Sequence, residues 1–410
     1  MTRTIDLEYG KSMKRKLNIR TAMEEASRCL LCHDAPCSRD CPAGTDPGSF
    51  IRSIRFRNIK GATETIRKNN ILGGCCSLIC PREKLCEEAC SRTGIDKPIR
   101  IGELQEFAIE QEKIFGMEVL KAPKDKKKGK IACVGAGPAS LACAAKLSLE
   151  GYDVTIFEAE EKPGGVLTYG INPSRLPQGV VEHDIKKIKD LGVKFVMNKR
   201  IDGKKDIKKL KDDFDAIHIG VGLGKSKEIE NKYINKNIDG VINALDFLKT
   251  ARENNGKIDI GEDVIVVGGG DVAMDCAMTA KQIGTNISIV YRRTIEEAPA
   301  SYEELEIVQK MGIPIITNFA PEKTIEENGR LAGVSFRSRD GHSTMNFKVD
   351  KLILAIGQEA SLGYRDLKLS DGIFASGDLI NGGETVVQAV ADGKKAALDI
   401  IDYLNKKEAK

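Results

Sequence analysis

Residues 130–158 read KIACVGAGPASLACAAKLSLEGYDVTIFE, which is the pattern of a strand, a glycine-containing turn, a helix and a second strand. Gly135 and Gly137 permit a tight turn and a close approach of the backbone to a pyrophosphate, and the N-terminus of the helix supplies amide donors. Glu158 ends the second strand, where a carboxylate accepts hydrogen bonds from ribose hydroxyls. Ser140 replaces the usual third glycine, which affects helix packing but no phosphate contact. The pattern predicts a dinucleotide-binding unit.

A second unit of this kind occupies residues 263–291, DVIVVGGGDVAMDCAMTAKQIGTNISIVY, and its loop has the form G-x-G-x-x-A. The strand after its helix is followed by Arg292 and Arg293 and has no acid at its tip. Guanidinium groups form charge-assisted hydrogen bonds with a 2′-phosphate, so this pair favours NADPH over NADH. The alternative is a solvated arginine pair that Glu296 and Glu297 neutralise. The two units indicate an internal duplication of nucleotide-binding folds.

Two more glycine turns belong with the first unit. Residues 162–167 read KPGGVL, and residues 375–378 read ASGD, after a predicted late strand at 351–357. Each turn alone would be read as an ordinary loop. Together, and in this order after a dinucleotide loop, they are typical of FAD sites in flavoproteins with two dinucleotide domains.

Nine of the twelve cysteines lie between Cys29 and Cys90. Residues 29–41 read CLLCHDAPCSRDC, and residues 75–90 read CCSLICPREKLCEEAC. Thiolates at such spacings close around iron–sulfur clusters, and a cysteine followed by proline is typical of ferredoxin runs. The surrounding residues 1–118 show helical periodicity. Zinc sites usually use paired Cys-x2-Cys ligands, and the longer gaps here break that rhythm.

Length and composition narrow the class of protein. The 410 residues suit about three domains, and the apolar fraction of 41% suits ordinary globular cores. The 64 basic and 60 acidic residues are interspersed and give no case for a nucleic-acid partner. No apolar stretch approaches the roughly 18 residues of a membrane helix, and the first residues lack the apolar core of a signal peptide. We therefore expect a cytoplasmic protein, in which clustered cysteines bind metal rather than form disulfides.

The remaining cysteines and the histidines are predicted to be structural. Cys133, Cys143 and Cys276 fall on strands or helices of the dinucleotide units and are read as small buried hydrophobes. The scattered histidines are His33, His183, His218 and His342. We expect no side chain of this protein to act as a catalytic nucleophile or general acid.

Residues 26–47, ASRCLLCHDAPCSRDCPAGTDP, closely resemble the electron-input half of dihydropyrimidine dehydrogenase and, more distantly, the small subunits of glutamate synthase. The resemblance covers nearly the whole chain. It implies an α plus α/β fold, in which an N-terminal helical domain with two 4Fe–4S clusters precedes two Rossmann-like domains. The FAD domain is interrupted by the NAD(P)H domain. The implied ranges are 1–120 for the helical domain, 121–129 for a linker, 130–245 and 355–410 for the FAD domain, and 246–354 for the NAD(P)H domain.

The resemblance also implies the ligands of the clusters. One cluster would use Cys29, Cys32, Cys37 and Cys90, and the other would use Cys41, Cys80, Cys86 and Gln105. Crossed ligation is natural, because the last cysteine of a ferredoxin run also serves the other cluster. Counting alone would choose a thiolate in place of Gln105, and Cys76 is the alternative.

The nucleotide contacts carried over from the family fall in both units. For FAD they are Gly135, Gly137, Pro138, Ala139, Glu158, Gly165, Leu167, Arg175, Gly377, Asp378, Thr385 and Val386. For the nicotinamide nucleotide they are Gly269, Gly270, Asp271, Val272, Arg292, Arg293, Ala355, Ile356 and Gly357. The run Asn172-Pro173-Ser174 departs from the family pattern before Arg175.

The resemblance implies an electron-input subunit. Electrons would pass from NAD(P)H through FAD and the two 4Fe–4S clusters to an FMN-containing iron–sulfur partner, which reduces uracil or thymine to the 5,6-dihydropyrimidine. The assembly would be a hetero-oligomer without nucleic acid or membrane. Two alternatives stay open: a small subunit of glutamate synthase or a similar reductase, and a zinc-stabilised protein that senses nucleotides without catalysis.

Overall fold

The computed structural model describes residues 8–10, 16–125, 127–365, 369 and 371–409. Lys126 of the predicted linker and residues 1–7 and 11–15 of the predicted helical domain lie outside the described residues. The described chain forms two compact units. Unit 1 comprises Tyr169–Pro177 and Lys225–Glu359 with the described part of Met1–Met13, and unit 2 comprises the described parts of Lys14–Thr168, Gln178–Gly224 and Ala360–Lys410.

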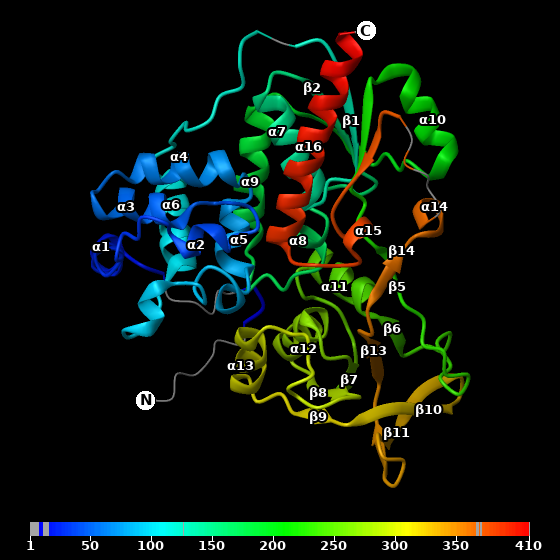
Figure 1. Ribbon diagram of the computed structural model, residues 1–410. Coiled ribbons are helices and arrows are strands. Elements are labelled where there is room, and N and C mark those ends of the chain that lie inside the picture. Colours follow the sequence, from blue (N-terminus) through cyan, green and yellow to red (C-terminus); the bar gives the residue numbers. More distant parts are fainter. Residues whose placement is uncertain (1–7, 11–15, 126, 366–368, 370, 410) are drawn as a thin grey trace. The chain divides into compact units, whose positions relative to one another are not determined.

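The N-terminal part of unit 2 consists of short helices around one apolar core (Figure 1, blue and cyan). Phe50, Ile51 and Ile54 lie at helical spacing and are buried against Ile66 and Phe107, which confirms the helical periodicity read from the sequence. The helices are α1 (Ile19–Ser27), α2 (Pro36–Arg39), α3 (Pro47–Arg55), α4 (Ile59–Asn69), α5 (Gly73–Ile79) and α6 (Ile101–Ile114), with 3-10 turns at Arg82–Lys84 and Ser91–Gly94.

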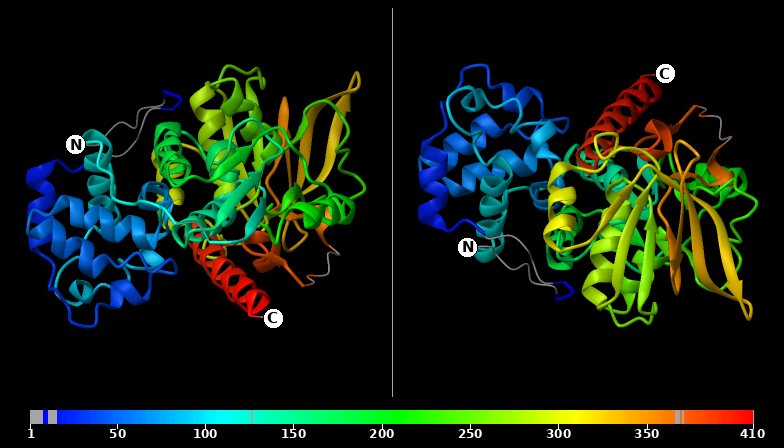
Figure 2. Two further views of the ribbon diagram at one scale, coloured as in Figure 1. Left: turned by 90° about the horizontal axis from the view of Figure 1, so that it is seen from above. Right: turned by 90° about the horizontal axis from the view of Figure 1, so that it is seen from below.

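A five-stranded parallel sheet forms the α/β part of unit 2, in the order β15-β4-β1-β2-β3. Its strands are β1 (Lys130–Val134), β2 (Asp153–Phe157), β3 (Lys194–Val196), β4 (Ala216–Ile219) and β15 (Ile373–Ala375). The helices of this part are α7 (Pro138–Leu149), α8 (Val166–Tyr169), α9 (Gln178–Asp190), α10 (Gly203–Asp213), α14 (Leu362–Arg365), α15 (Asp378–Asn381) and α16 (Val386–Glu408). The long helix α16 packs along α7, as the red and green ribbons in Figures 1 and 2 show.

Unit 1 repeats this plan with a parallel sheet in the order β6-β13-β7-β8-β9. Its strands are β6 (Val241–Asn243), β7 (Asp263–Val267), β8 (Asn286–Tyr291), β9 (Ile315–Thr317) and β13 (Lys351–Leu354), and its helices are α11 (Ala244–Glu253), α12 (Asp271–Ile283) and α13 (Tyr302–Lys310). In both sheets the central strand precedes the glycine loop, which supports the predicted duplication. A three-stranded antiparallel sheet of β10 (Phe319–Glu327), β11 (Arg330–Ser338) and β12 (Thr344–Lys348) is inserted before β13.

The fold class predicted from the sequence is confirmed, and the boundaries of the compact units can be compared with the predicted domains. The predicted FAD domain runs to residue 245, whereas unit 2 ends at Gly224 and β6 belongs to the sheet of unit 1. The chain returns to unit 2 at Ala360. The two crossings lie in β5 (Gly224–Ser226) and β14 (Gln358–Ala360), which pair with each other. Among the described residues, no helix has the length and apolar character needed to cross a membrane.

Candidate cofactor sites

The first glycine turn packs directly on the first dinucleotide loop in unit 2. The backbone N–H of Gly164 donates to the carbonyl oxygen of Ala136 over 2.9 Å. A Cβ atom added to Gly165 would lie 3.1 Å from the Cα atom of Gly137, so there is no room for a side chain. The turn and the loop, which the sequence predicted to bind the same FAD, are therefore neighbours. Leu167, the last predicted residue of this turn, is buried.

The late ASGD segment reaches the same loop. Gly377 has a φ of 72°, and a Cβ atom there would lie 2.8 Å from the Cβ atom of Ala139. Asp378 follows directly and accepts a hydrogen bond from the backbone N–H of Glu384 over 3.2 Å, and burial raises the pKa of its carboxyl group. Thr385 then caps α16. All three predicted FAD segments thus meet at the N-terminus of α7, where amide donors suit a pyrophosphate.

Glu158 occupies the position expected of a ribose ligand. Its carboxylate accepts the backbone N–H of Ala136 over 2.6 Å and that of Glu160 over 2.9 Å. These bonds fix the acid at the tip of β2, directly beside the glycine loop. The position of Gly135 in the loop requires glycine. Its φ is 89°, and an added Cβ atom would lie 2.8 Å from the carbonyl oxygen of Gly220. The chemistry and the space at this loop fit FAD.

The second loop, in unit 1, has its own steric requirements. A Cβ atom on Gly268 would lie 2.3 Å from the carbonyl oxygen of Ala355, which places the predicted segment after β13 beside the loop. A Cβ atom on Gly269 would lie 2.5 Å from the ring of Tyr291. Gly270 is the N-cap residue of α12. Backbone and an aromatic ring therefore surround the loop, and the Gly268 N–H donates to the carbonyl oxygen of Val290 over 3.1 Å, so a phosphate would use the amide groups at the start of α12.

The other residues predicted to bind the nicotinamide nucleotide lie around this loop. Asp271 begins α12 and accepts the backbone N–H of Ser301 over 3.0 Å. Arg292 and Arg293 follow β8 and are both exposed. The side chains of this pair are therefore accessible to a ligand phosphate. The remaining predicted residues, Val272, Ile356 and Gly357, lie at the start of α12 and after β13.

Arg175 belongs to unit 1, whereas the dinucleotide loop and the two glycine turns predicted to bind FAD belong to unit 2. One of its guanidinium nitrogens donates to both carboxylate oxygens of Asp275 over 2.8 Å, and another forms an ion pair with Glu304. Burial raises the pKa values of both carboxyl groups. Nearby, Asn172 donates to the hydroxyl of Thr279 over 2.8 Å, so the atypical run before Arg175 is bound to α12. The structure accounts for Arg175 as an ion-pair partner, and its contact with FAD stays a prediction.

Four cysteines predicted to share one cluster are neighbours in the helical part of unit 2. The pKa of the Cys37 thiol is raised to about 11 by burial and by the nearby Cys90, Cys29 and Cys32. The pKa of Cys29 is raised by burial and, to a smaller extent, by Cys90 and Cys32. These effects place Cys29, Cys32 and Cys90 near Cys37, and Cys37 also raises the pKa of Cys86, a member of the second predicted set. Three of them, Cys29, Cys37 and Cys90, also pack on the apolar core.

A second group contains Cys41, Cys80 and Cys86. The pKa of the Cys80 thiol is raised by a hydrogen bond with Cys76, by burial, and by charge interactions with Cys76, Cys86 and Cys41. The side chain of Gln105 is buried, and its amide donates to the carbonyl oxygen of Gly73 over 2.7 Å. Of the two candidates for the fourth ligand, Gln105 contacts the first residue of α5, and Cys76 lies on α5 itself. Cys76 is the candidate that is hydrogen-bonded to a cysteine of this group, Cys80.

The spacing of the sulfur atoms distinguishes a cluster from a single ion. A tetrahedral zinc with sulfur at 2.3 Å requires sulfur atoms about 3.8 Å apart. Among the described residues, no three cysteines between Cys29 and Cys90 have all their sulfur atoms within 4.8 Å of one another. Gathered but more widely spaced thiols fit an iron–sulfur cluster, which holds several metal atoms. The seven predicted cysteine ligands are also free thiols of intermediate exposure.

A buried ion network joins the cysteine-bearing helices to the α/β part within unit 2. The Arg67 guanidinium pairs with Glu112 over 2.7 Å and with Asp184 over 2.6 Å, and all three side chains are fully buried. Asp184 lies on α9 and accepts the backbone N–H of Cys75 over 2.8 Å. Lys187, which like Asp184 lies on α9, pairs with Glu112 over 3.1 Å. This network holds α5 at a fixed position relative to the FAD segments.

A compact set of potential metal ligands lies in the core of the FAD part. The ligand atoms of Cys133, Cys143 and His218 lie within 4.8 Å of one another, and all three residues are buried. The His218 ring already contacts two hydroxyls, that of Ser376 over 2.7 Å and that of Ser140 over 3.3 Å. With both ring nitrogens engaged, the set fits packing better than metal binding.

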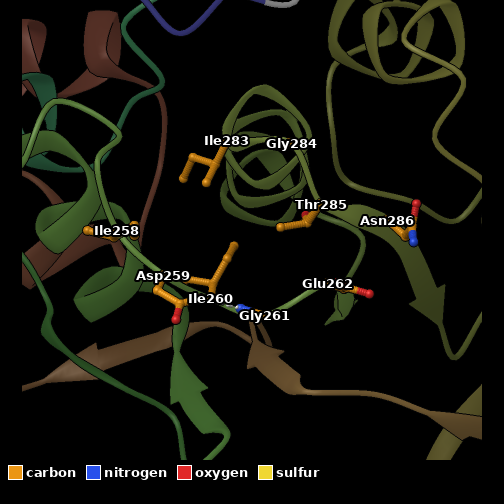
Figure 3. A pocket seen from close by; sticks show the side chains of 9 residues that line it. All are labelled: Ile258, Asp259, Ile260, Gly261, Glu262, Ile283, Gly284, Thr285 and Asn286. Atoms are coloured by element: carbon orange, nitrogen blue, oxygen red, sulfur yellow. Dashed lines mark hydrogen bonds between the residues drawn. The ribbon is translucent and has the colours of Figure 1, made fainter.

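A surface pocket of unit 1 lies around the starts of strands β7 and β8 (Figure 3). It has a volume of about 360 Å³ and is lined by residues 258–262 and 283–286, including Ile258, Ile260 and Ile283. Those residues precede β7 and β8, whereas the loop follows β7. Ligands of open parallel sheets bind at the carboxyl ends of the strands, so this pocket is separate from the nucleotide site.

Three features of the sites escaped the sequence analysis. The first is the ion network of Arg67, and the second is Gly220, which crowds the first loop from β4. The third is Lys394 on α16, whose ammonium group contacts the loop after Cys41. In the sequence, Arg67 and Gly220 are seen only as residues next to apolar neighbours. Nothing local distinguishes Lys394 from the many other lysines of the chain.

Comparison with known proteins agrees with this geometry. Residues 7–116 match the family described as "Dihydroprymidine dehydrogenase domain II, 4Fe-4S cluster", and residues 129–393 match the pyridine nucleotide-disulphide oxidoreductase family. The chain is 43% identical over 398 residues to the NAD-dependent dihydropyrimidine dehydrogenase subunit PreT of Escherichia coli K12, covering 93% of this chain and 94% of that protein. It is 30% identical to the beta subunit of an NADP(+)-dependent formate dehydrogenase of Moorella thermoacetica, covering 90% of this chain and 60% of that protein.

Solved structures share the fold at low sequence identity. FprA of Mycobacterium tuberculosis in complex with NADPH aligns with a TM-score of 0.58 and 14% identity, covering 69% of this chain and 86% of that chain. The thioredoxin reductase of Lactococcus lactis aligns with a TM-score of 0.54 and 18% identity, covering 68% of this chain and all of that chain. The α/β fold is thus shared with FprA and with thioredoxin reductase. With its iron–sulfur domain and its identity to PreT over almost the full length, the chain belongs to the PreT family of dihydropyrimidine dehydrogenase subunits, which are oxidoreductases.

Proposed function

We propose that the chain passes electrons from NAD(P)H, through FAD and two 4Fe–4S clusters, to a PreA-like FMN/4Fe–4S partner subunit that reduces uracil or thymine to the 5,6-dihydropyrimidine. The observation that carries the proposal is that the FAD segments and both cysteine groups belong to the same compact unit. A fixed arrangement of this kind suits electron transfer, which depends on the distance between centres. When bound, the flavin accepts a hydride and the clusters carry single electrons.

The residues of the chain bind and orient these groups and perform no covalent chemistry. Glu158, held by the N–H of Ala136, would accept the ribose hydroxyls of FAD, and the N-terminus of α7 would face the pyrophosphate. In unit 1, the N-terminus of α12 after Gly270 would face the pyrophosphate of the nicotinamide nucleotide. No side chain is assigned as a nucleophile or general acid.

The proposed cluster ligands are Cys29, Cys32, Cys37 and Cys90 for one cluster and Cys41, Cys80, Cys86 and Gln105 for the other. The electrostatic coupling among the first four thiols supports the first set. The contact of Cys76 with Cys80 makes Cys76 the competitor of Gln105. Replacing Gln105 by Ala should lower the iron content or shift one reduction potential, and replacing Cys76 by Ala should change neither. The opposite pattern would move the ligand to Cys76.

We also propose that NADPH is the preferred electron donor. The exposed Arg292 and Arg293 at the tip of β8 support this choice, because they suit a 2′-phosphate. The name of the E. coli relative, NAD-dependent, is the opposing observation. Steady-state assays with NADH and NADPH on the same preparation decide between them, and a higher kcat/KM for NADH would overturn this part of the proposal.

The central experiment uses the purified chain with and without its partner. Alone, the chain should oxidise NAD(P)H with an artificial electron acceptor and should leave uracil unchanged. Co-purified with its FMN partner, it should oxidise NAD(P)H in a uracil-dependent manner. Uracil reduction by the single chain would refute the two-subunit proposal, and anaerobic protein without acid-labile sulfide would refute the cluster assignment.

The rival function is electron input to a different reductase. The relative from Moorella thermoacetica, a formate dehydrogenase subunit, is 30% identical and favours the view that this scaffold serves several partners. The two proposals differ only in the final acceptor. NAD(P)H oxidation that depends on a glutamate synthase large subunit, but not on the FMN partner with uracil, would support the rival.

A further inference from the structure

Two adjacent residues of α16 contact different parts of unit 2. Gly393 contacts the first turn of α7, and Lys394 contacts the N-terminal helical part. A Cβ atom on Gly393 would lie 2.1 Å from the carbonyl oxygen of Ala139, so the backbone of α16 rests directly on the first turn of α7. The adjacent residue, Lys394, extends away from that contact. Its ammonium group donates to the carbonyl oxygens of Ala43 over 2.7 Å and Asn69 over 2.6 Å. Lys394 therefore connects the helical part of unit 2 to α16, the helix that follows the last predicted FAD segment.

The loop that Lys394 holds is the one that carries Cys41. Ala43 is two residues after Cys41, and Thr45 contacts the Cys41 sulfur through its hydroxyl over 3.3 Å and through its N–H over 3.4 Å. Asn70, which follows the second acceptor of Lys394, donates to the Thr45 hydroxyl over 3.3 Å. A continuous set of hydrogen bonds thus connects the contact points of Lys394 to the sulfur of Cys41.

Lys394 lies near the thiol of Cys41 and near the ammonium group of Lys146. Burial lowers the pKa of the Lys394 ammonium group, the nearby Cys41 opposes that shift, and Lys146 adds to it. Both hydrogen-bond acceptors of Lys394 are neutral carbonyls, and no ion pair with a carboxylate is formed within the described part of the chain. A half-buried cation without a carboxylate partner acts on any negative charge that gathers at Cys41, because the interaction is weakly screened there.

We propose that Lys394 is a positioning residue of the electron path, which fixes the Cys41 loop against α16 and raises the reduction potential of the cluster that Cys41 binds. This inference rests on the proposed function. Reduction adds one electron, supplied by the reduced flavin, and makes the cluster more negative by one charge. A fixed cation stabilises the reduced state over the oxidised state and so favours transfer from the flavin. The first cluster, which lacks this neighbour, should feel a smaller effect.

The test is a reductive titration of the anaerobically purified, cluster-loaded chain, followed by electron paramagnetic resonance. Lys394→Met should shift the reduction equilibrium of one cluster at least tenfold toward the oxidised form, which corresponds to 59 mV for a one-electron couple. Lys394→Arg should restore the wild-type potential, because it keeps the charge. Lys395→Met is the matched control, since Lys395 is the exposed neighbour on the same helix.

Iron, sulfide and flavin contents measured on the same samples separate the possible failures. Full cofactor content with an unchanged potential in Lys394→Met would overturn the inference and leave the proposed function intact. Wild-type protein without clusters would overturn the proposed function itself. If the Met variant loses iron, Lys394→Gln is titrated instead, because it keeps a hydrogen-bond donor without the charge. A wild-type potential in the Gln variant would overturn the electrostatic role.

Discussion

The two dinucleotide loops follow the central strands of two sheets that share the order of four strands, β4-β1-β2-β3 and β13-β7-β8-β9, and they differ at the tip of the next strand. At the first loop, the tip carries Glu158, whose carboxylate is bonded to the N–H of Ala136. At the second, Tyr291 covers Gly269 and the exposed Arg292 follows. The comparison teaches that the glycine turn provides the pyrophosphate cradle in both places. The strand tip, which varies, determines the chemistry offered to the ribose.

Each of the two units also contains one buried arginine paired with two carboxylates, and the charges are balanced differently. In unit 2, burial opposes ionisation of Glu112, but His183, Arg67 and Lys187 outweigh it and lower the pKa of Glu112 to about 2. In unit 1, burial raises the pKa values of Asp275 and Glu304 even though both pair with Arg175. Glu112 of unit 2 is therefore held in its ionised form, whereas Asp275 and Glu304 of unit 1 tend to take up protons.

The largest expected effect separates the two loops. Gly135→Ala should yield protein without flavin, because the new Cβ atom would lie 2.8 Å from a backbone carbonyl. Gly268→Ala, with its Cβ atom 2.3 Å from a carbonyl, should keep flavin and iron but lose NAD(P)H oxidation by about 100-fold or more. Flavin absorbance after gel filtration and assays with an artificial acceptor measure the two effects.

The control for the glycine variants is Gly192→Ala. Gly192 has the same φ of 89° as Gly135, but no atom lies within 4 Å of its added Cβ atom. This variant carries the backbone strain without the collision and should retain flavin. Flavin loss in both variants would show that strain alone is responsible. Equal losses of flavin in Gly135→Ala and Gly268→Ala would contradict the assignment of the first loop to FAD and of the second loop to NAD(P)H.

The next effect concerns the two arginines. Arg67→Met should lower the free energy of unfolding of unit 2 by about 3–5 kcal/mol, because buried carboxylates lose their partner. Arg175→Met should cost unit 1 less than about 3 kcal/mol, because Asp275 and Glu304 neutralise by protonation. Hydrogen exchange with mass spectrometry reports each unit separately. A larger loss in the Arg175 variant would contradict the proposed charge balance.

A smaller effect tests the tip of β8. Replacing Arg292 and Arg293 together by Gln should lower kcat/KM for NADPH about tenfold or more and leave the value for NADH nearly unchanged. The matched control is Arg330→Gln, an exposed arginine of β11 in the same unit that pairs with Asp239. Equal losses with both nucleotides would assign the pair to general binding rather than to the 2′-phosphate.

The smallest effect is a pH dependence in unit 1. The pKa of Glu304 is raised in the folded protein, so its contribution to stability is present at low pH and is lost as pH rises through the folded pKa. Glu304→Gln resembles the protonated form and should become more stable than the wild type as pH rises above the ordinary pKa of a glutamate carboxyl group. Each kcal/mol corresponds to about 2–4 °C in melting temperature. The exposed Glu306→Gln on the same helix should show no such trend.

Local patterns were sufficient for the secondary structure around the loops. The continuous apolar runs in β1 and β7, with glycines directly after them, predicted both strand-loop-helix units, which the structure contains. The periodicity of Phe50 and Ile54 predicted a helical N-terminal part. These signals succeed because strand and helix periods and glycine turns depend on near neighbours in the chain. The antiparallel insertion of β10 to β12 was not predicted, although half-buried and exposed residues alternate in β12.

Contacts between distant residues could not be predicted in this way. Arg67 reads as one more charged helical residue, and only the packed structure shows it buried between Glu112 and Asp184. Arg175 was assigned to FAD by resemblance, whereas the structure pairs it with Asp275 and Glu304. In each case the partner lies far along the chain, so no local spacing reveals it.

The sequence by itself determined the two glycine loops, the acid at one strand tip and the arginines at the other, and the grouping of cysteines in one N-terminal segment. These features depend on residue type and spacing alone. The tertiary structure decided which segments meet: Gly377 against Ala139, Cys37 beside Cys90, and Lys394 against the loop of Cys41. The physical reason is that such contacts arise when packed helices and strands bring remote residues within hydrogen-bonding distance, and chain order does not encode that proximity.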